Sequence, residues 1–275
     1  MNLRIDSRID LNNGTSIPRL GLGMYQIPDG SIAEHAVLYA LEIGYRHIDT
    51  AMMYGNEASV GKAIRESGLP REEIFVTTKL WNDDHGFEAA TDAFHRSLDT
   101  LGLDYIDLYL IHWPVETKRS DSWRALEAIS GQGLCRAIGV SNYTIGHLDE
   151  LLADCSVRPA VNQVEFSPFL NQTDLLDRCR QEGIVLEAYS PLTKGRRLDD
   201  SRLGSVAEAT GRSPAQVLIR WALQHDLVVI PKSARPQHIL ANAEVFDFTL
   251  SDEQMAILNG LNEDLRTSWD PTNQP

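Results

Sequence analysis

The chain has 275 residues, of which 43% are hydrophobic and 23% are charged, and these proportions are those of a folded globular protein rather than a disordered one. Its net charge of -14 repels phosphate backbones, so we expect neither DNA nor RNA as a partner. The chain has no apolar run of the roughly 18 residues that a membrane span needs, no apolar leader segment and no Cys-x-x-Cys pair, so we expect a cytoplasmic protein that contacts no membrane.

The first predicted element is a β-hairpin at residues 7–17, because Asn13-Gly14 is a residue pair that two-residue hairpin turns favour. Beyond it, short apolar segments alternate with longer amphipathic segments of helical period. The predicted strands are residues 19–23, 46–49, 74–80, 106–112, 137–141, 160–165, 185–189 and 228–231. The predicted helices are residues 31–43, 57–66, 88–101, 122–129, 145–152, 173–181, 214–225 and 253–261.

This alternation predicts an α/β fold in which the strands and their intervening helices close into one (β/α)8 TIM barrel. No proline-rich linker divides the chain, so we expect a single domain over residues 1–275. We expect the hairpin, within residues 1–18, to cap the bottom of the barrel, at the amino-terminal ends of its strands. Residues 266–275 are polar and are expected to form a loosely held tail.

Four polar side chains are predicted to meet at one face of this barrel. Asp49, Lys79 and His112 stand at or near the carboxyl ends of predicted strands, where barrel enzymes place their chemistry. Tyr54 lies in the loop that follows the strand ending at Asp49. A carboxylate, an ammonium, an imidazole and a phenol therefore converge on the mouth of the barrel.

These four groups suit the reduction of a carbonyl, which needs a hydride at carbon and a proton at oxygen. An ammonium stabilises a neighbouring phenolate, so we expect Lys79 to lower the pKa of Tyr54 from the ordinary tyrosine value of about 10. Asp49 would keep Lys79 charged and fixed in place, and an N–H of His112 would polarise the substrate carbonyl. A cofactor would supply the hydride.

Other interpretations of the same residues stay open at this point. Each residue alone can be a turn former, a solvated strand end or a buried histidine. One alternative function is an aldolase-like barrel in which Lys79 or Lys232 forms a Schiff base with the substrate. Another is a barrel that binds or senses a ligand without catalysis. We expect no metal site, because His47, Asp49 and His112 do not have a recognised ligand spacing.

Several segments, which together span nearly the whole chain, resemble the aldo-keto reductase family. The segments are GYRHIDTA with YGNE (residues 44–51 and 54–57), SLDTLGLDYIDLYLIHWP (97–114), IPKS (230–233), AIGVSN (137–142) and VNQVE (161–165). The first three are similar to the family's signature motifs, and the last two match barrel strands of the family. The overall resemblance is closest to the bacterial branch that includes the 2,5-diketo-D-gluconate reductases.

The resemblance implies an NADPH-dependent oxidoreductase that reduces aldehydes and ketones to alcohols. It implies a catalytic tetrad of Asp49, Tyr54, Lys79 and His112, with Tyr54 as the proton donor. The residues that it implies for cofactor binding are Gly23, Met24, Ser141, Asn142, Gln163, Tyr189, Ser190, Leu192, Lys232, Ser233, His238 and Asn242. The residues that it implies for the substrate pocket are Tyr25, Trp81, His112 and Trp113.

The cofactor residues have distinct implied roles. Ser141, Asn142 and Gln163 would bind the carboxamide of the nicotinamide, and Tyr189 would stack on its ring. The loop at residues 193–197 contains three basic side chains, which suit either an anionic ligand or plain solvation. No G-x-G-x-x-G motif follows a predicted strand, so a Rossmann unit is not expected to bind the cofactor.

One position departs from the family's pattern. His238 stands where the family usually has an arginine that binds the 2′-phosphate of NADPH. An arginine offers five N–H donors and a permanent charge, whereas a neutral histidine offers one N–H. Lys232, Ser233 and Arg235 lie nearby in the sequence. We therefore expect NADPH to be preferred by a smaller margin than usual, with NADH also accepted.

The loop at residues 114–122 and the carboxyl-terminal tail are short, whereas family members that hold steroids usually have longer loops there. We therefore expect an open, shallow pocket for a small carbonyl substrate such as an aldehyde, a dicarbonyl or a keto acid. We also expect the protein to act as a monomer.

Overall fold

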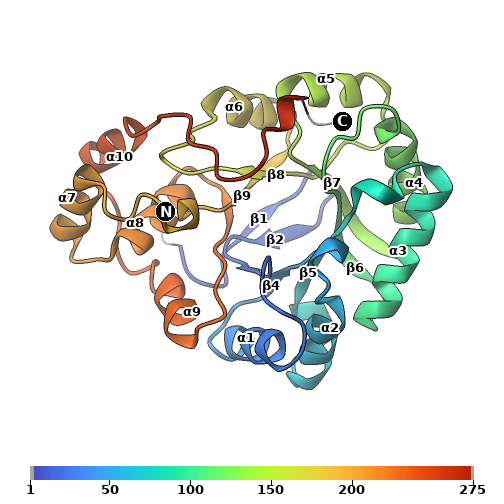
Figure 1. Ribbon diagram of the computed structural model, residues 1–275, viewed down its shortest axis with the longest axis horizontal. Coiled ribbons are helices and arrows are strands. Elements are labelled where there is room, and N and C mark those ends of the chain that lie inside the picture. The colour runs from blue at the N-terminus through green and yellow to red at the C-terminus, as the bar shows by residue number, and fades with distance from the viewer. Residues whose placement is uncertain (1–2, 274–275) are drawn as a thin grey trace.

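The computed structural model describes residues 3–273. Eight parallel strands form its central sheet, and their neighbours follow the order of the sequence (Figure 1). The strands are β3 (Leu22–Gly23), β4 (His47–Asp49), β5 (Phe75–Leu80), β6 (Ile106–Ile111), β7 (Cys135–Ser141), β8 (Val161–Glu165), β9 (Val185–Tyr189) and β10 (Val228–Ile230). Each strand coincides with one that the sequence predicts, to within a few residues at either end.

Backbone hydrogen bonds between the first and last strands close the sheet into a barrel. The amide of Gly21 donates to the carbonyl of Val229 at 2.9 Å, and that of Gly23 donates to the carbonyl of Pro231 at 3.2 Å. Gly21 is required here because a Cβ atom at this position would lie 2.6 Å from Nδ1 of His47, which is closer than any side chain allows. The predicted (β/α)8 barrel is confirmed.

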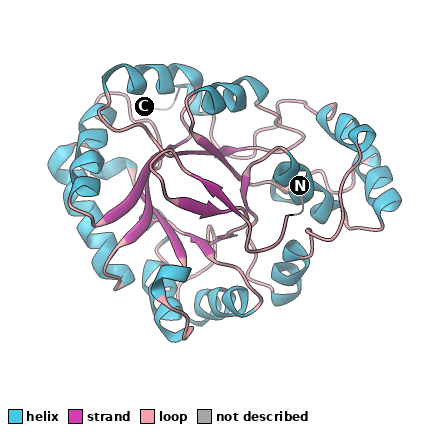
Figure 2. Ribbon diagram, turned by 180° about the vertical axis from the view of Figure 1, so that it is seen from behind, coloured by secondary structure: helices cyan, strands magenta, loops and turns pink. Residues whose placement is uncertain are grey.

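Helices cover the outside of the barrel, as the two opposite views in Figures 1 and 2 show. They are α1 (Ser31–Glu42), α2 (Glu57–Glu66), α3 (Phe87–Leu101), α4 (Arg119–Gly131), α5 (Ile145–Asp154), α6 (Thr173–Gln181), α7 (Ser201–Thr210), α8 (Pro214–Gln224), α9 (Pro236–Ala243) and α10 (Asp252–Asn259). Across residues 3–273, none of them combines the length and the apolar character that crossing a membrane requires.

The sequence does not predict α7 and α9. In α7, Gly204 interrupts a segment with few apolar residues, so no helical period stands out. The helix forms because the side chain of Asp200 accepts hydrogen bonds from the first free backbone amides, including that of Arg202 at 2.9 Å. The helix α9 has only eight residues, counting the opening Pro236, and such a short segment is stable only because tertiary packing supports it.

The antiparallel hairpin of β1 (Arg8–Asp10) and β2 (Ser16–Pro18) closes the bottom of the barrel. Its side chain of Ile17 is fully buried and packs into the barrel interior against a cluster that includes Leu108 and Val161. Full burial of one such side chain stabilises the fold by about 1.5–3 kcal/mol. The predicted hairpin and its place at the amino-terminal ends of the strands are confirmed.

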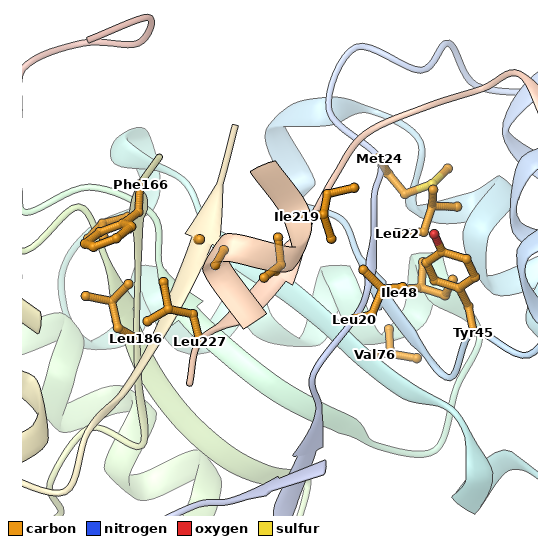
Figure 3. Packing of buried hydrophobic residues seen from close by; sticks show 14 of the residues in the cluster. Leu20, Leu22, Met24, Tyr45, Ile48, Val76, Phe166, Leu186, Ile219 and Leu227 are labelled. Carbon is orange, nitrogen blue, oxygen red and sulfur yellow. The ribbon is translucent and has the colours of Figure 1, made fainter. Parts of the chain in front are cut away.

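A larger apolar layer fills the space between the strands and the helices (Figure 3). Ile48 of β4 and Val76 of β5 belong to this layer and are fully buried there. Because side chains alternate along a strand, an outward Ile48 turns both His47 and Asp49 toward the barrel axis. The same alternation turns Lys79 inward, so the outer core determines which polar residues reach the mouth.

The carboxyl-terminal segment is not the loosely held tail that the sequence predicts. The buried carboxylate of Glu165 accepts hydrogen bonds from the backbone amides of Thr267 at 2.8 Å and Ser268 at 3.1 Å, and from the hydroxyl of Thr267. Nζ of Lys194 donates to the carbonyl of Thr267 at 2.6 Å. These partners come from distant parts of the chain, so local composition could not reveal them. Residues 274 and 275 of the predicted tail lie outside the described residues.

Candidate active site

The four predicted catalytic residues meet at the carboxyl ends of neighbouring strands. Nζ of the fully buried Lys79 lies 2.7 and 2.8 Å from the two carboxylate oxygens of Asp49 and 3.5 Å from the hydroxyl of Tyr54. It also donates to the carbonyl of Thr50 at 2.8 Å. The centroid of the His112 ring lies 5.7 Å from that of the Tyr54 ring. Three oxygen acceptors therefore fix the ammonium of Lys79, and the hydroxyl of Tyr54 lies next to it at a longer distance.

The loop that carries Tyr54 is held in place by the buried side chain of Asn56. Its Oδ1 accepts from the hydroxyl of Thr50 at 2.6 Å, and its Nδ2 donates to the backbone carbonyls of Met24 and Ile27. The short helix η1 (Met52–Tyr54) ends at Gly55, whose φ of 68° is in the left-handed region that favours glycine. The position of Tyr54 thus depends on contacts with the loop after β3.

The pKa of Tyr54 differs in direction from the prediction. Burial of the phenol, followed by the negative charge of Asp49, raises the pKa of Tyr54 well above its ordinary value. Lys79 does not reverse this effect, because its charge is already shared between the two oxygens of Asp49. The expectation of an acidified phenol is therefore wrong for the protein alone, and Tyr54 is a fully protonated group at neutral pH.

Burial shifts the pKa of His112 in the opposite direction, and it again favours the neutral form of the side chain. Desolvation, reinforced by the nearby ammonium of Lys79, holds the pKa of His112 well below its ordinary range. The imidazole is therefore neutral at physiological pH and carries a single N–H. Its ring also lies 5.2 Å from that of Trp81, edge to face. A neutral imidazole in this position can donate one hydrogen bond without bringing a second positive charge next to Lys79.

A pocket of about 630 Å³ opens above these residues. The four predicted pocket residues all line it: Tyr25, Trp81, His112 and Trp113. Met53 lines it as well. The tail residue Trp269 also lines the pocket, with its ring 5.4 Å from that of Trp113. The sequence analysis missed Trp269, although a tryptophan in a polar terminal segment was a possible signal. The pocket is therefore less open on this side than the short loops predict.

Eight of the twelve predicted cofactor residues line the same pocket: Gly23, Ser141, Asn142, Gln163, Tyr189, Ser190, Leu192 and Lys232. The other four do not line it. Met24 is buried in the apolar core, and Ser233, His238 and Asn242 lie on the segment from the end of β10 through α9. Of these, His238 is exposed.

Four polar residues that line the pocket form what we call its polar wall: Ser141, Asn142, Gln163 and Tyr189. Hydrogen bonds connect them. The hydroxyl of Tyr189 donates to Oδ1 of Asn142 at 2.8 Å, and Nδ2 of Asn142 donates to the backbone carbonyl of His112 at 3.0 Å. The hydroxyl of Ser141 donates to the backbone carbonyl of Gln163 at 2.8 Å. This network ties the strand ends of β6 to β9 together. It also holds the Tyr189 ring as a fixed flat surface in the pocket.

This wall fits a nicotinamide ring with its carboxamide. Nε2 of Gln163 donates to Asp49 at 2.8 Å and to Glu187 at 2.9 Å, whereas no hydrogen bond among residues 3–273 uses its amide oxygen. The pocket therefore combines an aromatic surface, from Tyr189, with an unused acceptor. The described residues contain no group of three His, Cys, Asp or Glu side chains that could hold a metal ion.

The basic loop at residues 193–197 partly serves the protein's own contacts. Lys194 binds the tail, and Nε of Arg197 donates to the carboxylate of Glu263 at 2.6 Å. Lys194 nevertheless lines the pocket. The loop therefore joins the pocket to the carboxyl-terminal tail, and Lys194 remains available at the pocket for an anionic ligand.

Comparison with known proteins agrees with this architecture. Residues 19–263 match the aldo/keto reductase family. The glyoxal reductase of Bacillus subtilis is 49% identical over 271 residues, which cover 98% of each chain. Among solved structures, an aldo-keto reductase from a Medee basin deep-sea metagenome library has a TM-score of 0.94 and 44% identity, covering 98% of this chain and all of that one. A Bombyx mori aldo-keto reductase in complex with NADP has a TM-score of 0.88 and 38% identity, covering 96% of this chain and 95% of that one.

The match covers far more than half of the chain, and the relatives align along nearly their full length. The family resemblance read from the sequence motifs is therefore confirmed, whereas the narrower resemblance to the 2,5-diketo-D-gluconate reductase branch stays a prediction. The solved relatives superpose along nearly the whole chain with TM-scores of 0.94 and 0.88, so this chain shares their fold. The chain belongs to the aldo/keto reductase family and is an oxidoreductase.

Proposed function

We propose that the protein uses NADPH to reduce small aldehydes, dicarbonyls and keto acids to alcohols, with Tyr54 as the proton donor. The observation that carries this proposal is the position of Nζ of Lys79, which lies between both oxygens of Asp49 and the hydroxyl of Tyr54 at the base of the pocket. The complex of the Bombyx mori relative with NADP supports the choice of cofactor.

The cofactor would supply the hydride, and the residues of the polar wall would orient its nicotinamide. Tyr189 offers its ring as a stacking surface, and Gln163 offers its amide oxygen, which accepts no hydrogen bond from the residues that the structure describes. Stacking on one side leaves a single face of the nicotinamide toward the substrate. The transfer would therefore be stereospecific.

Tyr54 and His112 both act on the carbonyl oxygen. The neutral His112 donates its N–H and polarises the carbonyl before the hydride arrives. Tyr54 then transfers its proton to that oxygen as negative charge develops. An alkoxide is a far stronger base than a phenolate, so a phenol with a raised pKa still donates downhill. Lys79 stabilises the phenolate that is left behind, because its ammonium is 3.5 Å away.

The walls of the pocket favour a compact substrate. Trp81, Trp113 and Trp269 border it, and the tail that carries Trp269 is anchored by Glu165. The similarity to a glyoxal reductase supports dicarbonyls as one substrate class. Loss of NADPH absorbance at 340 nm should accompany turnover of glyoxal-type dicarbonyls, short aldehydes and keto acids. No turnover with any of these classes would contradict the proposal.

The aldolase alternative fits the site less well. A Schiff base requires a lysine with a free, neutral amine. Nζ of Lys79 makes three hydrogen bonds of 2.7–2.8 Å to oxygen acceptors, so it is not free to attack a carbonyl carbon. Borohydride treatment in the presence of substrate, followed by peptide mass mapping, should therefore leave Lys79 unmodified.

We predict that Trp269→Ala weakens substrate binding more than it slows turnover. Removing the indole takes away one wall of the pocket and its packing against Trp113, while Tyr54 and Lys79 keep their positions. The KM for a dicarbonyl should rise about fivefold, with kcat changed less than twofold. Phe87→Ala is a suitable control, because Phe87 is an exposed aromatic residue outside the pocket. A reduced kcat at constant KM would contradict this role.

We also predict that His238→Arg increases the preference for NADPH over NADH. His238 is exposed on the first turn of α9, and Lys232 and Arg235 precede it. A guanidinium at this position adds a permanent charge and bidentate donors for the 2′-phosphate of NADPH. The ratio of kcat/KM for the two cofactors should therefore rise about tenfold, mainly through a lower KM for NADPH. An unchanged ratio would show that position 238 does not contact the phosphate.

A further inference from the structure

A buried polar cluster lies directly beneath the catalytic residues, inside the barrel. Glu187 of β9 is fully buried, and its Oε2 accepts from Nε2 of Gln163 at 2.9 Å. The same Nε2 donates to Oδ2 of Asp49 at 2.8 Å. On its other side, Oε1 of Glu187 faces Nε2 of the buried His47 at 3.6 Å. Neither Glu187 nor His47 has a role in the mechanism described above.

We propose that Glu187 is a positioning residue that, together with Asp49, fixes the amide of Gln163 with its oxygen toward the cofactor side of the pocket. An amide has one donor end and one acceptor end, and the carboxylate of Asp49 can only accept. Oε2 of Glu187 also accepts when the proton of its carboxyl lies on Oε1, the oxygen that faces His47. Two acceptors on Nε2 therefore leave its Oε1 as the group presented for hydrogen bonding. This inference rests on the proposed function, in which Gln163 binds the carboxamide of the nicotinamide.

The surroundings of Glu187 favour the uncharged form of its carboxyl. Burial and the neighbouring negative charge of Asp49 raise the pKa of Glu187 to about 8, so the carboxyl is protonated at neutral pH. Burial lowers the pKa of His47 to about 3, so the imidazole beside it is neutral as well. The acid thus provides an acceptor to Gln163 without competing with Asp49 for the single ammonium of Lys79.

The protonated acid has a close structural equivalent in glutamine, and this provides the conservative variant. A glutamine at position 187 keeps the shape of the side chain and can offer a carbonyl oxygen to Nε2 of Gln163. Methionine has a similar length and flexibility but offers no comparable acceptor. A comparison of Glu187→Gln with Glu187→Met therefore separates the hydrogen bond from simple filling of the barrel.

The test measures the dissociation constant of NADPH by quenching of protein fluorescence, for variants whose far-ultraviolet circular dichroism matches the wild type. Glu187→Met should weaken NADPH binding about fivefold, and Glu187→Gln should stay within twofold of the wild type. Asp107→Asn is the control, because Asp107 is a buried carboxyl paired with Arg71 outside the pocket. Its dissociation constant should equal that of the wild type.

A double variant determines whether Glu187 acts through Gln163. If it does, Gln163→Leu combined with Glu187→Met should bind NADPH no more weakly than Gln163→Leu alone. Additive weakening, or equal binding by Glu187→Met and the wild type, would overturn the inference. Glu187→Leu replaces Glu187→Met in the same comparison if the methionine variant does not fold. Failure of the proposed function would instead appear as a wild-type protein that neither binds NADPH nor reduces carbonyls.

Discussion

Tyr54→Phe should lower kcat for carbonyl reduction by about 10²–10⁴-fold while leaving the affinity for NADPH unchanged. The change removes only the hydroxyl, which is the proton source in the proposed mechanism, and a general acid typically contributes a factor of this size. The ring keeps its contacts with Tyr25 and His112, at centroid distances of 5.1 and 5.7 Å. Steady-state kinetics with a saturating dicarbonyl, combined with a fluorescence titration of NADPH, measures both quantities.

The matched control for this variant is Tyr109→Phe. Tyr109 lies on β6 and is fully buried, and its hydroxyl has no hydrogen-bond partner among residues 3–273. Removing that hydroxyl should leave kcat within about twofold of the wild type, since it is outside the pocket. Tyr54→Phe that keeps more than a tenth of the wild-type kcat would require another proton donor and would refute the assignment.

Lys79→Met should affect both catalysis and stability. Without the ammonium, the phenolate of Tyr54 loses its nearest positive charge, and the carboxylate of Asp49 is left buried without a counter-ion. Removing one partner of a buried ion pair typically costs about 3–5 kcal/mol of folding free energy. Urea unfolding at neutral pH should show a loss of this size, and turnover should fall at least as far as in Tyr54→Phe.

The loss of stability in Lys79→Met should shrink as the pH is lowered. Burial already raises the pKa of Asp49, and the ammonium opposes that rise, so the variant should have a still higher folded-state pKa. A carboxyl whose folded pKa exceeds its unfolded value contributes most stability below the unfolded value, and this contribution disappears as pH rises through the folded one. The difference from the wild type should therefore be smaller at pH 4 than at pH 8.

A surface pair provides the control for that experiment. Lys62 pairs with Glu34 at 2.7 Å, but its side chain is 48% exposed. An ion pair exposed to water contributes little to the free energy of unfolding. Lys62→Met should leave both the unfolding free energy and its pH dependence close to those of the wild type. A constant difference between Lys79→Met and the wild type from pH 4 to pH 8 would mean that Asp49 does not take up a proton.

The sequence by itself determined the barrel and indicated which polar groups meet at its mouth. Each strand is short, apolar and followed by a helical period, and such alternation permits few topologies. Asp49, Lys79 and His112 could be placed at one face because parallel strands carry their carboxyl ends at the same edge. The starts predicted for the helices at residues 214–225 and 253–261 also agree with the structure to within one residue, and there the side chains of Ser213 and Ser251 cap backbone amides.

Only the tertiary structure decided the environment of those groups. The direction of the Tyr54 pKa, the neutrality of Glu187 and the anchoring of the tail to Glu165 all depend on partners far apart in the sequence. Desolvation is a property of the packed interior, and a pattern of residue types contains no measure of it. The sequence therefore indicates which chemistry is available, whereas three-dimensional packing sets the protonation state in which each group performs it.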